Sequence, residues 1–273
     1  AKRVRQGKLN DINETLIPLG IIMAVSMFVV VVLQKDLGTG VSLVALVLSV
    51  LAVSGVDARL LRRIVLVIAA AALVLTFSSS HRIERVMTFI QGDTHQSASR
   101  DENNYHIQQA RIAIGSGGLL GLGIGKSVQA TGYLPEAIND SIFAVMGETF
   151  GFVGLSVILA LFSALLLSLL KVTSRLADMH LRLVVAGVFG WVASHVLMNI
   201  GSMTGIIPMT GISLPLLSYG GTSMLFIAAA LGLAFQLSAY TAHKPLMEGE
   251  GSGKDLGGRR RLGRTRYASR GSV

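Results

Sequence analysis

The chain has 273 residues, of which 51% are hydrophobic and 14% are charged, and its mean hydropathy is +0.62. Soluble domains carry about 25% charged residues, so this composition excludes an ordinary soluble protein, and its low charge excludes a disordered one. The absence of cysteine excludes a disulfide scaffold, thiolate metal sites and cysteine nucleophiles. The sequence therefore predicts an integral membrane protein.

Apolar segments are long enough to cross a hydrocarbon core of about 30 Å, which takes about 20 helical residues. Six are predicted, at residues 16–33, 39–56, 61–77, 142–170, 183–200 and 222–240. The fourth is over-long, so we expect it to tilt or to have an interfacial end. No segment has the alternation of a barrel strand, so the prediction is an all-α polytopic membrane domain at 16–240.

The basic residues give the orientation of the spans. Eighteen of the 24 Lys and Arg residues fall on the side formed by 1–15, 57–63, 171–182 and 241–273, which is therefore predicted to be cytoplasmic. The net charge of +9 is then explained by the orientation of the spans and by contact of the basic residues with lipid headgroups. No nucleic-acid partner is expected. The tail 241–273 is predicted to be disordered, and it contacts anionic lipid or docks a cytoplasmic partner.

Two loops lie on the opposite side, at 78–141 and 201–221. The first is far longer than an ordinary helix connection, which indicates a function. It opens with Arg82 and Arg85, three residues apart, which serve either as interface anchors or as a seat for a pyrophosphate. No signal peptide precedes the first span, and we expect further helices to belong before it.

A glycine-rich stretch at 115–127 ends in Gly-Lys-Ser, as phosphate-binding loops do. That motif requires glycine at position 120, which is Leu120 here, and the segment lies on the side away from cytosolic ATP. A nucleotide site is therefore rejected. The glycines indicate instead a close-packed or re-entrant segment, or one where the backbone approaches a ligand.

Three carboxylates, those of Glu136, Asp140 and Glu148, lie where the long loop meets the fourth span. Asp140 has two interpretations: a cap at the helix start, or a general base whose pKa is raised by partial burial. Glu148 lies two turns into the span and must be paired or face a cavity.

The second loop is apolar but broken by Pro208 and Pro215, so its backbone must be buried in protein or line a cavity. Beside it, His195 and Asn199 lie four residues apart, and hydrogen bonding between helices is the favoured interpretation. The histidines show no metal-ligand spacing, so no metal cage is expected.

Four short sequence motifs, in the same order along the chain, resemble those of a known protein family. In order they are Asp-Leu-Gly-Thr at 36–39, Arg-Ile and Arg-Val within 82–86, Ala-Ile-Gly-Ser-Gly-Gly at 113–118 leading to Tyr-Leu-Pro-Glu-Ala at 133–137, and Leu-Pro with Ser-Tyr-Gly-Gly within 214–221. From about 16 to 240 the chain resembles the last six of the ten spans of the SEDS family, the FtsW, RodA and SpoVE proteins. The Pro-Glu-Ala sequence at 135–137 resembles that of the division or sporulation members more than that of RodA.

The resemblance implies a peptidoglycan glycosyltransferase that uses lipid II in the bacterial cytoplasmic (inner) membrane, with its catalytic loop on the extracytoplasmic face. The family's catalytic aspartate falls on Asp140, although Ile138-Asn139 replaces the usual His-Thr before it and Gly147-Glu148-Thr149 replaces Gly-Glu-Glu. Arg82 or Arg85 would offset the charge of the departing undecaprenyl pyrophosphate. The candidate contacts to sugar or peptide are Gln109, Ser127, Gln129, Tyr133, Glu136 and Ser218.

The implied partners are a class B penicillin-binding protein transpeptidase and other division or elongation membrane proteins. No cofactor is required by the sequence, and a Mg²⁺ or Mn²⁺ ion bridging the pyrophosphate is left open. Two other functions stay open: a flippase for the lipid-linked precursor, and a non-catalytic division scaffold. An ion-coupled transporter is less favoured because buried charges are few.

Overall fold

The computed structural model describes residues 17–77, 83 and 101–250, and all six predicted spans are helical in it. No strand occurs in these ranges, so the all-α prediction is confirmed. The elements are α2 (Ile17–Met27), the π-helix η2 (Phe28–Leu33), α3 (Leu37–Ser54), α4 (Ala58–Phe77), α6 (Asp101–Ser116), the 3-10 turn η4 (Gln129–Thr131), α7 (Ile142–Arg175), α8 (Met179–Met203) and α9 (Gly221–Glu250).

Among the described residues, four helices are long and apolar enough to cross a membrane: α3, α7, α8 and the 221–241 part of α9. The continuous helix formed by α2 and η2 is shorter. The remaining predicted span, α4, begins with three arginines within its first six residues, which places its start at a membrane surface. The chain is therefore a multi-pass membrane protein.

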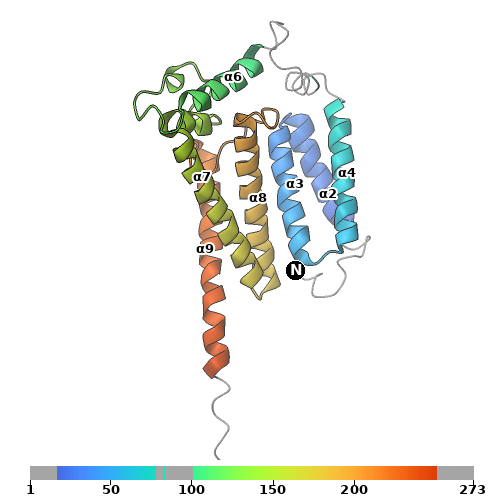
Figure 1. The fold of residues 1–273 in the computed structure, drawn as a ribbon. Helices are drawn as coiled ribbons and strands as arrows, with labels where there is room; N and C mark the ends of the chain where they lie inside the picture. Colours follow the sequence, from blue (N-terminus) through green and yellow to red (C-terminus); the bar gives the residue numbers. More distant parts are fainter. Residues whose placement is uncertain (1–16, 78–82, 84–100, 251–273) are drawn as a thin grey trace, which may run out of the picture.

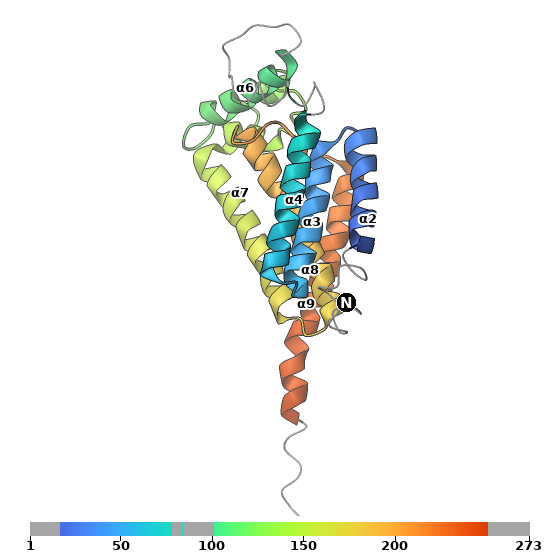
Figure 2. The ribbon, with the colours of Figure 1, turned by 90° about the vertical axis from the view of Figure 1, so that its right-hand side faces the viewer.

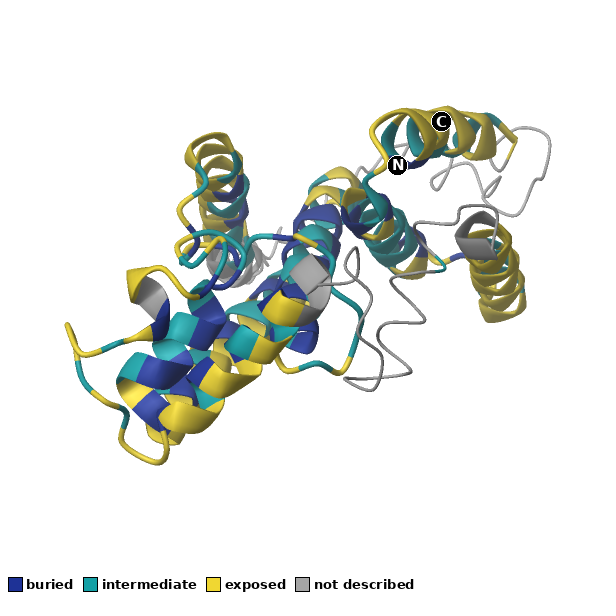
Figure 3. Ribbon diagram, turned by 90° about the horizontal axis from the view of Figure 1, so that it is seen from above, coloured by how far each residue is buried: buried dark blue, intermediate teal, exposed yellow. Residues whose placement is uncertain are grey.

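The most buried of the spans is α8, with α3 on one side and α7 on the other (Figure 1). Small residues let α3 and α8 approach closely, as is common between membrane helices. The Ser49 hydroxyl donates a hydrogen bond to the Ala186 carbonyl at 2.7 Å, and a side chain at Gly190 would collide with Ser49. Viewed from above, the buried residues concentrate where α6, α7 and α8 meet (Figure 3).

The bundle has two ends. The site end carries the hairpin 34–36, residues 101–141 and the loop 204–220, and the basic end carries the connections 55–57 and 176–178. At the basic end α9 extends beyond the other helices (Figure 2). It continues to Glu250, so the prediction of a disordered tail from residue 241 is wrong for its first ten residues, which extend the helix that begins at Gly221. The segments 1–16 and 251–273 lie outside the described residues.

The long loop contains a helix that the sequence interpretation did not include. α6 lies across the site end of the bundle (Figure 1) and packs on α7. Its buried face includes Ala110 and Ala113, both fully buried, and His106. The loop 204–220 follows the prediction more closely, because its Ile212, Leu214 and Ser218 are buried in protein.

The glycine-rich stretch packs backbone to backbone against α7. Leu122 and Gly123 donate hydrogen bonds to the carbonyls of Glu148 and Thr149 at 2.9 and 3.0 Å. α7 is interrupted at Gly151, whose φ of 66° and ψ of −166° are not helical. The prediction of a close-packed segment is confirmed, and the over-long fourth span is a kinked helix.

We expect Gly121→Ala to destabilise the protein by about 3 kcal/mol or more, because its φ is +81° and an added Cβ would collide with the Thr149 carbonyl. Thermal unfolding in detergent measures the effect. Gly123→Ala is the matched control, because Gly123 also has a positive φ of +91° but nothing lies within 4 Å of an added Cβ. Equal melting temperatures for the two variants would contradict the close packing.

Candidate functional site

Two loops and one helix end meet at the site end, and Asn199 of α8 holds them together. Its side chain is 0% exposed, and its amide nitrogen donates to the carbonyls of Asp140 and Ile212, both at 2.7 Å. The Tyr219 amide adds a bond of 2.9 Å to the Ile138 carbonyl. The turn at 135–141 is therefore fixed to the loop 204–220 through its backbone. Hydrogen bonding between helices was the favoured interpretation of His195 and Asn199; Asn199 instead bonds the carbonyls of a turn and a loop, and His195 accepts a bond from Trp191 within its own helix.

The Asp140 side chain is half-buried beside this loop. Gly211, with φ +68°, leaves space for it, because a Cβ there would lie 3.5 Å from Asp140 Oδ2. Within the described part of the chain, no group donates a hydrogen bond to the carboxylate. Burial, reinforced by the nearby charge of Glu136, raises the pKa of Asp140 to about 6. The group is thus ionised at neutral pH yet more basic than an ordinary aspartate.

Glu136 occupies the same turn but is exposed. Its backbone has φ +49°, a conformation that few side chains other than Asn and Asp adopt readily, and its carboxylate accepts a bond from Asn139 Nδ2 at 2.5 Å. The turn therefore presents one exposed and one half-buried carboxylate. The asymmetry in burial is what makes Asp140 the better base of the two.

A buried histidine of α6 also contacts this turn. His106 Nε2 lies 2.5 Å from the hydroxyl of Ser141, which in turn donates to the Pro135 carbonyl at 3.0 Å. Because the Ser141 proton is used in that bond, His106 must be the donor. Burial lowers the pKa of His106, although Glu136 opposes this, so the neutral Nε2–H form is favoured. His106 shares its buried helical face with Ala110 and Ala113, and it was not singled out from the sequence.

With Asp140 as the general base that the family resemblance implies, we expect His106→Ala to slow glycan polymerisation about tenfold, because the turn that carries the carboxylate loses its hydrogen bond to α6. His106→Gln keeps an N–H donor and should retain most of the rate. Steady-state kinetics on both variants measure the effect, with the loss in kcat rather than KM. Equal rates for the Ala and Gln variants would show that the hydrogen bond does not matter.

Ser127 and Gln129, two of the predicted substrate contacts, gather around Glu148. This carboxylate is 1% exposed and accepts bonds from the Ser127 hydroxyl at 2.5 Å and from the amides of Val128 and Gln129 at 3.0 and 3.2 Å. The expectation that Glu148 is paired is confirmed. The side-chain oxygen of Gln129 is buried and has no hydrogen-bond partner among the described residues.

The other predicted contacts differ in accessibility. Tyr133 is exposed and Gln109 is partly buried on α6. Ser218 is buried, and its hydroxyl accepts a bond from the Leu214 amide at 2.6 Å, so it stabilises its own loop. Arg82 and Arg85 lie outside the described residues. In the described ranges, no group of three His, Asp or Glu side chains could hold a metal ion.

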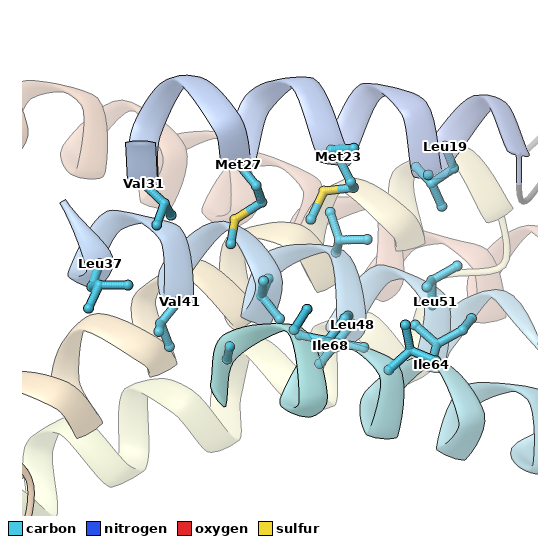
Figure 4. A pocket seen from close by; sticks show the side chains of 17 residues that line it. Leu19, Met23, Met27, Val31, Leu37, Val41, Leu48, Leu51, Ile64 and Ile68 are labelled. Atoms are coloured by element: carbon cyan, nitrogen blue, oxygen red, sulfur yellow. The ribbon is translucent and has the colours of Figure 1, made fainter. Parts of the chain in front are cut away.

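An apolar cavity of about 580 Å³ opens between α2, α3 and α4 (Figure 4). Val31, Leu37 and Val41 line its part nearest the site end, and Leu19, Leu51 and Ile64 line the opposite part. The start of α3 lies between the cavity and the loop beside Asp140, because Leu37 lines the cavity and a Cβ on Gly38 would lie 2.9 Å from the Thr210 carbonyl, next to Gly211. A long apolar groove and a half-buried carboxylate therefore lie on neighbouring elements.

Residues 2–243 match the family described as "Cell cycle protein", that of FtsW, RodA and SpoVE. The chain belongs to this family. It is 35% identical over 242 residues to "Stage V sporulation protein E" of Bacillus subtilis, which covers 88% of this chain and 64% of that one. It is also 35% identical over 245 residues to "Probable peptidoglycan glycosyltransferase FtsW" of Mycobacterium tuberculosis, covering 90% of this chain and 45% of the relative.

One solved structure is also similar to this chain. The chain superposes with TM-score 0.62 and 25% identity on a chain from "Structural coordination of polymerization and crosslinking by a peptidoglycan synthase complex", covering 82% of this chain and 62% of that one. Our chain thus spans between about half and two thirds of these relatives. The predicted family is confirmed.

Proposed function

We propose that the protein is a peptidoglycan glycosyltransferase that polymerises lipid II, with Asp140 as its general base. The observation that carries this proposal is the half-buried Asp140 carboxylate at the site end, whose pKa is raised to about 6. A relative named as a probable peptidoglycan glycosyltransferase supports the reaction class.

In the proposed reaction, the 4-hydroxyl of the N-acetylglucosamine of lipid II attacks C1 of the N-acetylmuramic acid at the reducing end of the growing strand. The C1–O bond to phosphate breaks, and undecaprenyl pyrophosphate leaves with the electron pair. Asp140 takes the hydroxyl proton, and the new bond is β-1,4. A single displacement of this kind inverts the α-linked donor and requires one base and a stabilised leaving group.

The apolar cavity between α2, α3 and α4 supports the same proposal, because a polyprenyl chain needs an apolar groove that ends at the site. The Gly38–Thr210 contact would bring the headgroup of a lipid in that groove to the loop beside Asp140. We assign Arg82 and Arg85 to the pyrophosphate, and Gln109 and Tyr133 to sugar or peptide contacts. Binding in the groove would supply proximity to the base.

The proposal extends to location and partners. The site end would face the extracytoplasmic side of the bacterial cytoplasmic membrane, where lipid II is consumed. A class B penicillin-binding protein transpeptidase would cross-link the product, which agrees with the peptidoglycan synthase complex among the similar structures.

The test is polymerisation of lipid II by the purified full-length protein with its transpeptidase, followed by gel separation of the glycan. We expect kcat/KM to rise about tenfold for each pH unit below about 6 and to level off above it, because Asp140 must lose its proton to act as base. No polymer at any pH would favour a flippase or scaffold. A profile that is flat from pH 5 to 7 would remove Asp140 from the base role.

A further inference from the structure

The glycine-rich segment exposes a row of large apolar side chains at the site end. We call residues 117–125 the glycine loop. Leu120 and Ile124 are 81% and 84% exposed, Leu119 is similarly open, and Leu122 is less so. No charged residue occurs from 112 to 125. Such a row is unusual in water and requires a partner that covers it.

The position of the glycine loop is fixed by α7. The amides of Phe152 and Val153 donate to the carbonyls of Gly118 and Leu119 at 2.9 and 3.1 Å, and the Gly123 amide donates to the Thr149 carbonyl. The loop therefore lies at the level of residues 149–153, just at the Gly151 kink. Its depth in the membrane is that of this part of α7.

The length of α7 gives that depth. The helix has 34 residues, about 51 Å at 1.5 Å per residue, whereas the hydrocarbon core takes about 20 residues. At the basic end, Lys171 and Arg175 must reach a membrane surface. Counting about 20 residues back from Lys171 reaches Gly151, so the boundary of the hydrocarbon on the site side falls at the kink.

The exposed row continues an exposed apolar face of α7. Phe150, Val153, Val157 and Leu161 are exposed at helical spacing along this helix, and a span of this composition turns such a stripe toward lipid. Val153 bonds directly to Leu119, where the stripe meets the glycine loop. The apolar surface is therefore continuous from the middle of the membrane to the loop.

We infer that the glycine loop is a lipid-inserted wedge, with Leu119, Leu120 and Ile124 immersed in the headgroup and upper acyl region on the site side. The occupant of this surface is the bilayer. Because the glycine loop is bonded to the start of α7, which directly follows the turn bearing Asp140, the wedge would set the height of that carboxylate above the lipid. The inference itself does not depend on the proposed reaction.

Single-cysteine labelling tests the wedge, since the described chain contains no cysteine of its own. Any cysteine elsewhere in the full-length protein is first replaced by serine. Leu120→Cys and Ile124→Cys are labelled with the fluorophore NBD, and the protein is placed in vesicles of phosphatidylethanolamine and phosphatidylglycerol. Phe152→Cys is the lipid-facing control, and Tyr105→Cys, exposed on α6, is the aqueous control.

We expect NBD at positions 120 and 124 to emit at shorter wavelength than at 105. Lipids brominated near the headgroup should quench it more than lipids brominated near the chain end, and aqueous iodide should quench it at most a third as strongly as at 105. Iodide quenching equal to that at 105 would overturn the inference. Blue-shifted emission quenched by neither agent would also overturn it, because protein would then cover the row. Two label sites guard against a local folding defect at either one.

Discussion

Replacing Asp140 with Asn is expected to reduce glycan polymerisation by a factor of about 10² to 10⁴, the range that general bases contribute. The amide has nearly the same shape but cannot accept the proton of the attacking hydroxyl. The fold should persist, because Asn199 binds the backbone carbonyl of residue 140 and not its side chain. Lipid II turnover by the full-length protein measures the effect.

The same substitution should leave the protein at least as stable at neutral pH, which separates lost chemistry from lost folding. The pKa of Asp140 rises from 3.8 to about 6 on folding, so the folded state binds this proton more tightly than the unfolded state. That contribution to stability is fully present below about pH 4 and disappears as the pH rises through 6. Relative to wild type, Asp140→Asn should therefore gain melting temperature between pH 4 and pH 7.

The matched control is Asp57→Asn, the same chemical change at the basic end of the bundle, where it should leave polymerisation unaltered. Glu136→Gln provides a second comparison. Removing this charge lowers the pKa of Asp140, so the acid limb of the pH profile should move to lower pH. Normal polymer from a folded Asp140→Asn protein would remove Asp140 from the role of general base.

The fold was largely predictable because membrane spans have a strong local signal. Twenty apolar residues in a row specify a helix in lipid whatever their neighbours are, and all six such segments are helical. The helix α6 was missed because its buried face is made of Ala110, Ala113 and one histidine, which contribute little hydrophobicity. Its packing on α7, rather than its own composition, stabilises it.

The candidate site was predictable only in part. The sequence singled out Asp140 and required a partner for Glu148, because a carboxylate near lipid is costly alone. It could not name His106 as the support of the Asp140 turn, since Ser141 lies 35 residues away and no local spacing records the pair. The assignment of substrate contacts stays a prediction. Ser127 and Gln129 donate hydrogen bonds to Glu148, a structural role that the sequence pattern did not reveal.

Glu148 carries the second large expected effect. Its buried carboxylate accepts from the Ser127 hydroxyl and from the amides of Val128 and Gln129, and so it fixes the segment that follows the glycine loop. Glu148→Ala leaves these donors in a buried space without an acceptor, and breaking a buried charged network costs roughly 3–5 kcal/mol. We expect a matching loss of thermal stability, faster amide exchange at residues 128 and 129, and little remaining polymerisation.

A graded series distinguishes the carboxylate from the bulk of the side chain. Ser127→Ala removes one neutral donor and should cost about 1 kcal/mol. Glu148→Gln keeps the volume and one acceptor oxygen but turns an NH₂ group toward donors, so its cost should lie between those of Ser127→Ala and Glu148→Ala. Melting temperatures in that order, with amide exchange at 128 and 129 rising in parallel, would establish Glu148 as the acceptor that holds this segment. If Glu148→Gln were as stable as wild type, the negative charge would be dispensable and van der Waals packing alone would explain why the residue is buried.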